Sequence, residues 1–258
     1  MKISKHIAYF YIENRIEYIE RIITEASKYP CTTDIFIHTN VESIPFTETL
    51  TYDNGNFEIV YHDLSGLNPY SLTEMPRKMI KSQKEDYDIF MYLEDDILVP
   101  REAIMYWLKY NELCIEHKYN IGFLRIETSE KNNKQYITDL YGEKMNTRIE
   151  IFGETFCVND KNPYCAFWIY NKNEFAKFVD SKFYDIKNVD YAGDTRASCA
   201  AGLHGKNIHW YKNTIIPMMN KTTPVNECKI YHMTNNYVDA DHSGINKFAT
   251  ILFDDCVE

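Results

Sequence analysis

The stretch IFMYLEDDILVP, residues 89–100, decides how we interpret the chain. A run of strand-forming apolar residues ends in three adjacent acids, Glu94, Asp95 and Asp96, and then resumes at Ile97. Adjacent carboxylates repel one another and are poorly solvated at the end of a buried strand, so we expect a positive charge beside them. The alternative is a strand end whose acids lie on a solvated rim, and the apolar residues on both sides argue against it.

The net charge of the chain limits which positively charged group could lie beside the three acids. There are 38 acids against 28 Lys and Arg, a formal net charge of -10, which argues against general nucleic-acid binding because a phosphate-tracking protein needs a basic face. Hard divalent cations take oxygen ligands and keep positions for substrate phosphates when only one or two carboxylates hold them. The acids at 94–96 therefore predict a divalent metal site next to a phosphorylated ligand.

Length and composition predict a single globular domain over residues 1–258. No segment approaches 18 uninterrupted apolar residues, and the first apolar run is too short for a signal peptide, so we expect no membrane span. The seven cysteines show no C-x-x-C spacing, which indicates reduced thiols and a cytoplasmic location.

Strand and helix signals alternate in the first half of the chain. A capping box at Asn14 and Glu17 is expected to open a helix that ends before Pro30. The other predicted helices cover 73–84 and 101–117, and the predicted strands cover 6–12, 34–40, 57–63 and 88–95. This alternation predicts an α/β fold with a parallel sheet, whose ligand lies beyond the carboxyl ends of the strands near a switch in strand order.

The second half shows short strands with polar turns. We expect strands at 121–127, 136–141, 148–153, 154–158, 164–170, 207–211 and 228–232, and helices at 173–181 and 194–204. No linker rich in Gly, Pro or Ser separates a second domain. Residues 121–258 are therefore expected to continue one mixed sheet.

The order strand, helix, strand, strand, helix, strand and then Glu-Asp-Asp resembles the GT-A type of nucleotide-sugar glycosyltransferase with its DXD-type motif. A larger set resembles an uncharacterised GT-A-like group of plants, bacteria and large viruses: residues 67–73, Arg77, the acid triplet, Asn162-Pro163-Tyr164 with Trp168, Arg196-Ala197-Ser198, and His232 with Asn235-Asn236-Tyr237. The chain departs from that group at Asn68 and Pro76, where the group has histidines. The matches span about residues 60–240.

The resemblance implies a GT-A, Rossmann-like fold: a central mixed sheet flanked by helices, with a small antiparallel excursion in the second half. Residues 1–120 would form the nucleotide-binding half and 121–258 the acceptor-side half. The implied activity is metal-dependent transfer of a sugar from a nucleotide-sugar donor, with a UDP-sugar favoured, to a glycan or protein acceptor.

The resemblance also implies a metal site. Asp96, the last acid, would ligate Mn²⁺ or Mg²⁺, while Glu94 and Asp95 support it and reach the ribose or a metal-bound water. A C-terminal histidine often completes such sites, and His232 is the best-placed histidine. The alternative for His232 is a hydrogen-bonded structural role.

Four residues are candidates for the nucleotide. Arg77 would face the nucleotide, where its fork can pair with phosphate or a base edge. Lys81 lies one turn later, with a solvated helix face as the alternative. Tyr11, at the end of the first strand, would line a uracil pocket unless it only packs, and Arg15 follows it.

Sequence leaves the stereochemistry open. An inverting enzyme needs a carboxylate base beside the acceptor hydroxyl, and Asp194 is our candidate, with a helix N-cap as the alternative role. In a retaining enzyme Asp194 would position the sugar or acceptor, with Arg196 near the diphosphate. Trp168 is a candidate for stacking on a sugar, with a place in the core as the alternative.

Three rival functions compete with this interpretation. A nucleotidyltransferase would need a Gly-rich turn after the first strand, and IENRIEY has no glycine. A metal-dependent phosphoesterase would gather several Asp and His residues, whereas only His62-Asp63 and Asp241-His242 are adjacent pairs. A catalytically inactive nucleotide-sugar-binding module remains possible because of the departures at Asn68 and Pro76.

Overall fold

The computed structural model describes residues 1–45, 51–189, 195–201, 213–239 and 249–258. Contacts divide the chain into two compact units. The first unit comprises Met1–Arg101 and Ala166–Ile208, and the second comprises Glu102–Cys165 and His209–Glu258. Strand β11 (Phe167–Asn171) returns to the first sheet, so the first unit holds residues of both expected halves, and the division at residue 120 stays a prediction. The expectation of one domain over 1–258 stays a prediction.

The first unit is built on one mixed sheet in the order β11-β4-β1-β2-β3. Its other strands are β1 (Lys2–Tyr9), β2 (Thr32–Thr39), β3 (Phe57–Tyr61) and β4 (Ile89–Glu94), which run parallel to their neighbours, while β11 runs antiparallel to β4. The chain proceeds from β1 outward through β2 and β3 and then places β4 on the other side of β1. The switch in strand order thus lies between β1 and β4.

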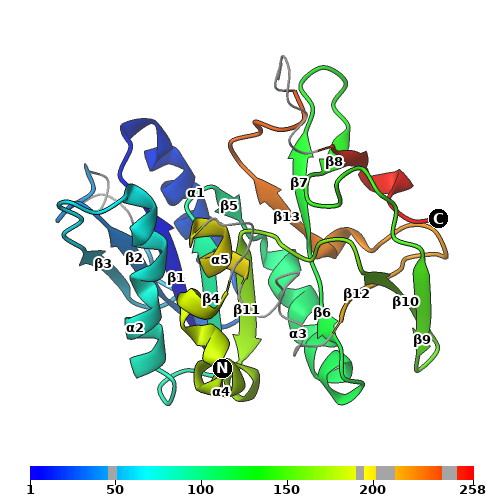
Figure 1. The fold of residues 1–258 in the computed structure, drawn as a ribbon, viewed down its shortest axis with the longest axis horizontal. Helices are drawn as coiled ribbons and strands as arrows, with labels where there is room; N and C mark the ends of the chain where they lie inside the picture. Colours follow the sequence, from blue (N-terminus) through cyan, green and yellow to red (C-terminus); the bar gives the residue numbers. More distant parts are fainter. Residues whose placement is uncertain (46–50, 190–194, 202–212, 240–248) are drawn as a thin grey trace. The chain divides into compact units, whose positions relative to one another are not determined.

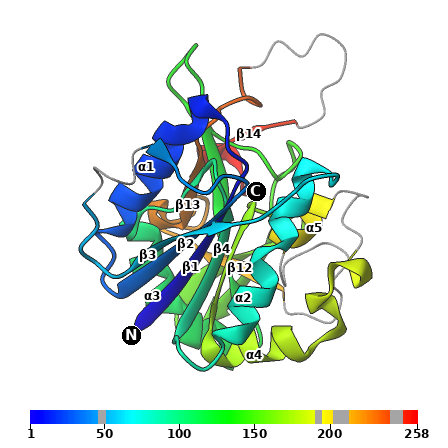
Figure 2. The ribbon, with the colours of Figure 1, turned by 90° about the vertical axis from the view of Figure 1, so that its left-hand side faces the viewer.

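Helices cover both faces of this sheet (Figures 1 and 2). α1 (Ile16–Ala26) packs on one face, and α2 (Pro76–Ser82), α4 (Lys172–Asp180) and α5 (Thr195–Ala201) lie on the other. The predicted apolar face of α1 is confirmed, since Ile19, Ile22, Ile23 and Ala26 are buried. These helices make the first unit an α/β structure, as expected.

Two helix starts differ from the prediction. A 3₁₀ turn at Glu13–Arg15 precedes α1, so Asn14 does not cap it and the expected capping box is wrong. A second 3₁₀ helix occupies Pro69–Glu74, and α2 begins only at Pro76. Proline is tolerated in the first turn of a helix but not in its interior, which explains why the predicted helix 73–84 is divided there.

The second unit contains α3 (Arg101–Glu116), apart from its first residue, and two further mixed sheets. One has the order β6 (Asn120–Ile121), β12 (Thr214–Pro217), β10 (Glu154–Asn159), β9 (Thr147–Ile151). The other contains β14 (Ile251–Leu252), β8 (Gln135–Ile137), β7 (Leu124–Thr128), β13 (Lys229–His232). The prediction of one continuous sheet is wrong, because the expected strand 121–127 is split into β6 and β7, which join different sheets.

The remaining short elements are β5 (Ile97–Leu98) and 3₁₀ helices at Lys182–Tyr184, Ile186–Asn188, Asn226–Cys228 and Phe253–Asp255. The expected strand 207–211 and the ends of the expected helix 194–204 lie outside the described residues. Within the described ranges, none of the helices is long and apolar enough to span a membrane. All seven cysteines are buried and none forms a disulfide.

Candidate functional site

A pocket of about 440 Å³ opens in the first unit at the carboxyl ends of β1 and β4. The register pairs Ala8 of β1 with Glu94 of β4, so the two strand ends meet at the switch in strand order. Open α/β sheets bind their ligands at this place. The pocket is lined by Ala8, Phe10, Ile12, Arg15, Asn68, Pro69, Tyr70, Leu72, Thr73, Glu94, Asp95 and Arg196.

The three acids at residues 94–96 are buried at that strand end. Glu94, Asp95 and Asp96 are 7%, 5% and 6% exposed, so a solvated rim is excluded. Burial, and after it the charge of Asp96, raises the pKa of Asp95 to about 8, although Arg15 opposes both effects. A small cation at this point would favour the charged form of the carboxylates.

Arg15 supplies one positive charge beside the acids. Its Nη1 lies 2.7 Å from Oδ1 of Asp95 and 3.7 Å from Oδ2 of Asp96. Burial lowers the pKa of Arg15, but the two aspartates raise it above its ordinary value overall. The 3₁₀ turn that displaced the expected cap is what brings Arg15 to the pocket, directly before α1.

Arg196 and Tyr70 form the opposite part of the lining. Nε of Arg196 lies 3.7 Å from Oε2 of Glu94, and its guanidinium carbon lies 5.6 Å from the Tyr70 ring. Tyr70 is 57% exposed, and the Asn68 side chain accepts the Tyr70 N–H at 3.0 Å. Sequence reasoning missed Tyr70 as a site residue, although Asn68-Pro69-Tyr70 stands in the loop that precedes the acid strand.

The charges of the pocket can be compared with what a metal site needs. With all three carboxylates ionised, the state that a bound cation would favour, they leave one formal negative charge against the two guanidiniums of Arg15 and Arg196. Among the described residues, no group of three or more His, Cys, Asp and Glu is arranged to hold a metal. The described donors do not fit an all-protein cage, and a cation here would be held by one or two carboxylates, with its other ligands from water and substrate.

The structure does not bring Arg77 or Lys81 to the pocket. Arg77 is buried on α2, where its guanidinium donates to the main-chain oxygens of Tyr184 and Cys199 and lies over the Phe178 and Tyr184 rings. It ties α2 to the segment after α4. Lys81 is exposed on α2, which agrees with the solvated helix face that was its alternative.

Trp168 and Tyr11 also pack elsewhere. Trp168 is buried, stacks on Tyr92 and Tyr170, and donates its Nε1–H to the oxygen of Cys199, so it occupies the core position that was its alternative. Tyr11 packs edge-on against Tyr9, and its N–H donates to Oδ1 of Asn40. Its neighbours Phe10 and Ile12 line the pocket instead. Asp194 lies outside the described residues.

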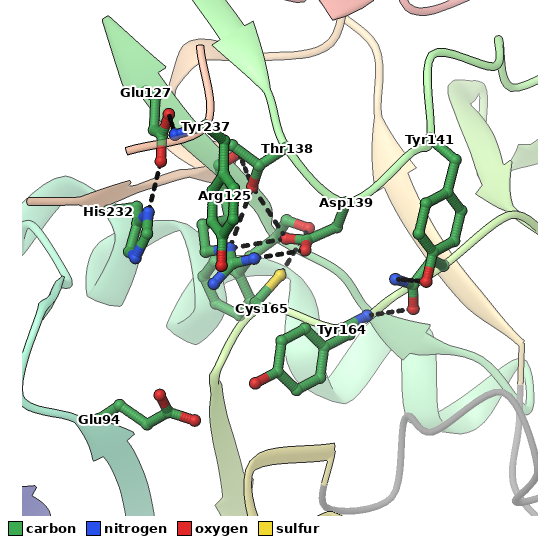
Figure 3. Close-up of polar contacts among 12 residues, drawn as sticks. Glu94, Arg125, Glu127, Thr138, Asp139, Tyr141, Tyr164, Cys165, His232 and Tyr237 are labelled. Carbon is green, nitrogen blue, oxygen red and sulfur yellow. Dashed lines mark hydrogen bonds and ion pairs between the residues drawn. The ribbon is translucent and has the colours of Figure 1, made fainter. Parts of the chain in front are cut away.

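The second unit holds a separate polar cluster (Figure 3). Arg125 donates twice to Asp139, from Nε at 2.9 Å and from Nη2 at 2.6 Å. Nδ1 of His232 lies 2.5 Å from Oε1 of Glu127, and His232 is buried. The hydrogen-bonded role considered for His232 is thus present, while its role as a metal ligand stays a prediction.

No protein-family model matches the chain, and no curated protein matches it. The function is therefore inferred from the pocket residues and their contacts.

Proposed function

We propose that the chain is a metal-dependent glycosyltransferase of the hexosyl type. It would move a sugar from a nucleotide-sugar donor, a UDP-sugar in first place, to a glycan or protein acceptor in the cytoplasm. One observation carries the proposal: three buried carboxylates lie at the switch in strand order of the mixed sheet, where the parallel strands β1 and β4 end, beside a pocket that two arginines also line. This combination suits a ligand that is both phosphorylated and accompanied by a metal.

The charges give each pocket residue a role. Asp96 would hold Mn²⁺ or Mg²⁺ with support from Asp95 and Glu94. When bound, the metal neutralises negative charge on the leaving diphosphate. Arg15 and Arg196 lie beside these carboxylates and would pair with phosphate oxygens by charge-assisted hydrogen bonds.

The apolar part of the lining would hold the rest of the donor. The exposed Tyr70 ring offers a flat surface for a base or a sugar face, and Thr73 donates to the Tyr70 oxygen at 2.7 Å, which fixes the short helix that carries the ring. Asp194 stays our candidate for the base of an inverting reaction or for positioning in a retaining one. The rival of an inactive binding module would use the same pocket without turnover.

Thermal-shift and turnover measurements with UDP, GDP and their common sugars test the proposal, each with Mn²⁺, Mg²⁺ or EDTA. We expect one nucleotide to raise the melting temperature only with metal, together with slow hydrolysis of its sugar nucleotide. Asp96→Asn should abolish both effects, whereas Asp63→Asn, an exposed acid after β3, should leave them intact.

Metal-dependent binding without any hydrolysis would favour the inactive module. If no nucleotide responds to metal, or if the Asp96 variant responds like the wild type, the transferase assignment is wrong.

A further inference from the structure

Strand β9 (Thr147–Ile151) forms one edge of the four-stranded sheet of the second unit. It pairs antiparallel with β10 through the two-residue turn Phe152-Gly153, which joins the register partners Ile151 and Glu154. In the part of the chain that the structure describes, β9 pairs with no other strand, and Figure 1 shows it as the outer strand of this sheet. Such an edge offers main-chain donors and acceptors to a further strand.

The main-chain groups of Arg148 and Glu150 face the open side of this edge. Opposed residues of an antiparallel pair alternate between hydrogen-bonded and non-hydrogen-bonded pairs. The main-chain oxygen of Thr155 in β10 accepts the N–H of Met218, directly after β12, at 2.9 Å, so Thr155 faces β12. Its register partner Glu150, and Arg148 two residues earlier, therefore direct their N–H and C=O groups away from β10.

The side chains of the same two residues carry opposite charges. Arg148 and Glu150 are both exposed, and they lie on one face of β9 because they are two residues apart. In an antiparallel pairing of two copies about Ile149, each Arg148 lies opposite the Glu150 of the other copy. The neighbouring registers with outward-facing main chains would place Arg148 opposite Arg148 or Glu150 opposite Glu150. Since like charges directly opposite one another are unfavourable, the charges select the register about Ile149.

We propose that β9 is the interface of a symmetric homodimer, in which the β9 strands of two copies pair antiparallel about Ile149. Arg148 and Glu150 of opposite copies exchange main-chain hydrogen bonds and pair their side-chain charges at the same positions. Each copy uses the same surface, so the contact closes on itself after two chains. The inference is independent of the proposed transferase activity, since it uses only β9 and its neighbours in the second unit.

The turn beside this edge supports the dimer. Phe152 has a φ of 48°, which is rare for a bulky residue, and its side chain is 78% exposed. Two-residue turns with positive φ at both central positions, as at Phe152 and Gly153, favour Asn, Asp or Gly at the first of them. The proposed register places Phe152 opposite Asn146 of the second copy, so association would cover part of an apolar ring that a single chain exposes to water.

Charge reversal in the full chain tests this interface. Sedimentation equilibrium over a series of concentrations should show a monomer–dimer equilibrium for the wild type. Arg148→Glu and Glu150→Arg each place like charges opposite one another at both pairs, and each should raise the dissociation constant of the dimer at least about 10-fold. Lys134→Glu is the control, because it changes the net charge as Arg148→Glu does but replaces an exposed lysine outside β9, and it should leave the dissociation constant unchanged.

Combining the two variants tests the register itself. A mixture of Arg148→Glu and Glu150→Arg chains places opposite charges at both facing pairs, so it should form a heterodimer with about the affinity of the wild type. The double variant exchanges the two residues and should dimerise like the wild type, which separates loss of pairing from loss of the fold. A wild type that stays monomeric at every concentration, a dimer that charge reversal does not weaken, or a mixture that does not associate would each overturn the proposal.

Discussion

Arg125 in the second unit and Lys5 in the first are both buried cations, and they are held in different ways. Arg125 donates twice to Asp139, and although burial lowers the pKa of Arg125, this carboxylate raises it overall. Lys5, which is 0% exposed, contacts the hydroxyl and ring of Tyr29, and burial lowers its pKa to about 7.

The carboxylates differ in their neighbours. Burial raises the pKa of both, but Asp139 accepts both bonds of the Arg125 fork, whose charge lowers its pKa. Asp95 instead shares a buried strand end with two other acids, and burial and the charge of Asp96 raise its pKa to about 8. The second unit thus buries charge in a matched pair, and the first buries charge that its surroundings compensate only in part. Perturbed pKa values cluster at functional sites, which agrees with the proposed ionic ligand.

The largest effect that tests this comparison is expected for Asp139→Ala. Removal of the carboxylate leaves the Arg125 guanidinium buried without its partner, which should lower the free energy of unfolding by about 3–5 kcal/mol. Urea denaturation, followed by circular dichroism, measures this change in the free energy of unfolding. Asp160→Ala, an exposed acid of the same unit, is the control and should change stability by less than about 0.5 kcal/mol. A loss of only that size in Asp139→Ala would show that the pair is not matched as described.

The second expected effect concerns histidines that the first unit buries without charge. His6, His38 and His62 form a row across β1, β2 and the end of β3, with nitrogen-to-nitrogen distances of 2.8 Å. Burial lowers the pKa of His6 to about 3 and, together with the charges of the neighbouring histidines, that of His38 to about 2. Both rings therefore stay neutral in the folded protein.

Acid should consequently destabilise the first unit. Below a pH of about 6.5 the unfolded chain binds protons that the folded chain does not, so stability falls as the pH falls, by about 4 kcal/mol between pH 7 and pH 5 for the two rings. Denaturation at a series of pH values measures the slope. His38→Gln should make it shallower, and His117→Gln, a residue of the second unit outside this row, should leave it unchanged. Equal slopes in all three proteins would contradict the assignment.

The third largest effect is expected for Lys5→Met, and it is a gain in stability. In the wild type the unfolded chain binds a proton between pH 7 and 10.5 that the folded chain lacks, so stability rises with pH in this window. Methionine fills similar space without a charge and should raise the free energy of unfolding at pH 7 by about 1–3 kcal/mol while removing that rise. Lys28→Met, an exposed lysine, is the control. A loss of stability would mean that the contact of Lys5 with Tyr29 outweighs the burial of its charge.

The sequence predicted those features of the fold and of the candidate site that depend on local patterns. The strand of residues 89–94, the apolar face of α1 and the place of the acids follow from periodicity and from the flanking apolar residues. Arg77 shows where such patterns stop, because its partners Tyr184 and Cys199 are more than 100 residues away. No residue near Arg77 in the sequence indicates that its side chain contacts a distant segment of the chain and not the pocket.

The same limit applies to Trp168 and to the second unit. Both faces of the sheet are covered in the first unit, so the alternation in YCAFWIY could not tell which face of β11 meets a helix and which could meet a ligand. In the second unit, β12 pairs with β10 and β13 with β7, pairings that span about 60 and 100 residues. Such long-range pairings decide how many sheets form, and short polar strands carry little information about them.

The smallest effect expected is for Asp95→Asn, and it bears most directly on the comparison. Because the pKa of Asp95 is raised from 3.8 to about 8, the folded metal-free protein holds a proton in this window that the unfolded chain has released, so stability falls as the pH rises through it. Asparagine removes this dependence and should stabilise the protein at pH 8 by about 1 kcal/mol, partly offset by the lost contact with Arg15. Denaturation at pH 5 and pH 8 measures the sign of the stability change and its pH dependence.

The Asp95→Asn variant is the counterpart of Asp139→Ala, since each removes one buried carboxylate that contacts an arginine. Opposite signs at pH 8 would establish that the acids at the end of β4 are held under repulsion that a bound cation would relieve, whereas a loss of several kcal/mol would place Asp95 and Arg15 in the same class as the matched pair of the second unit.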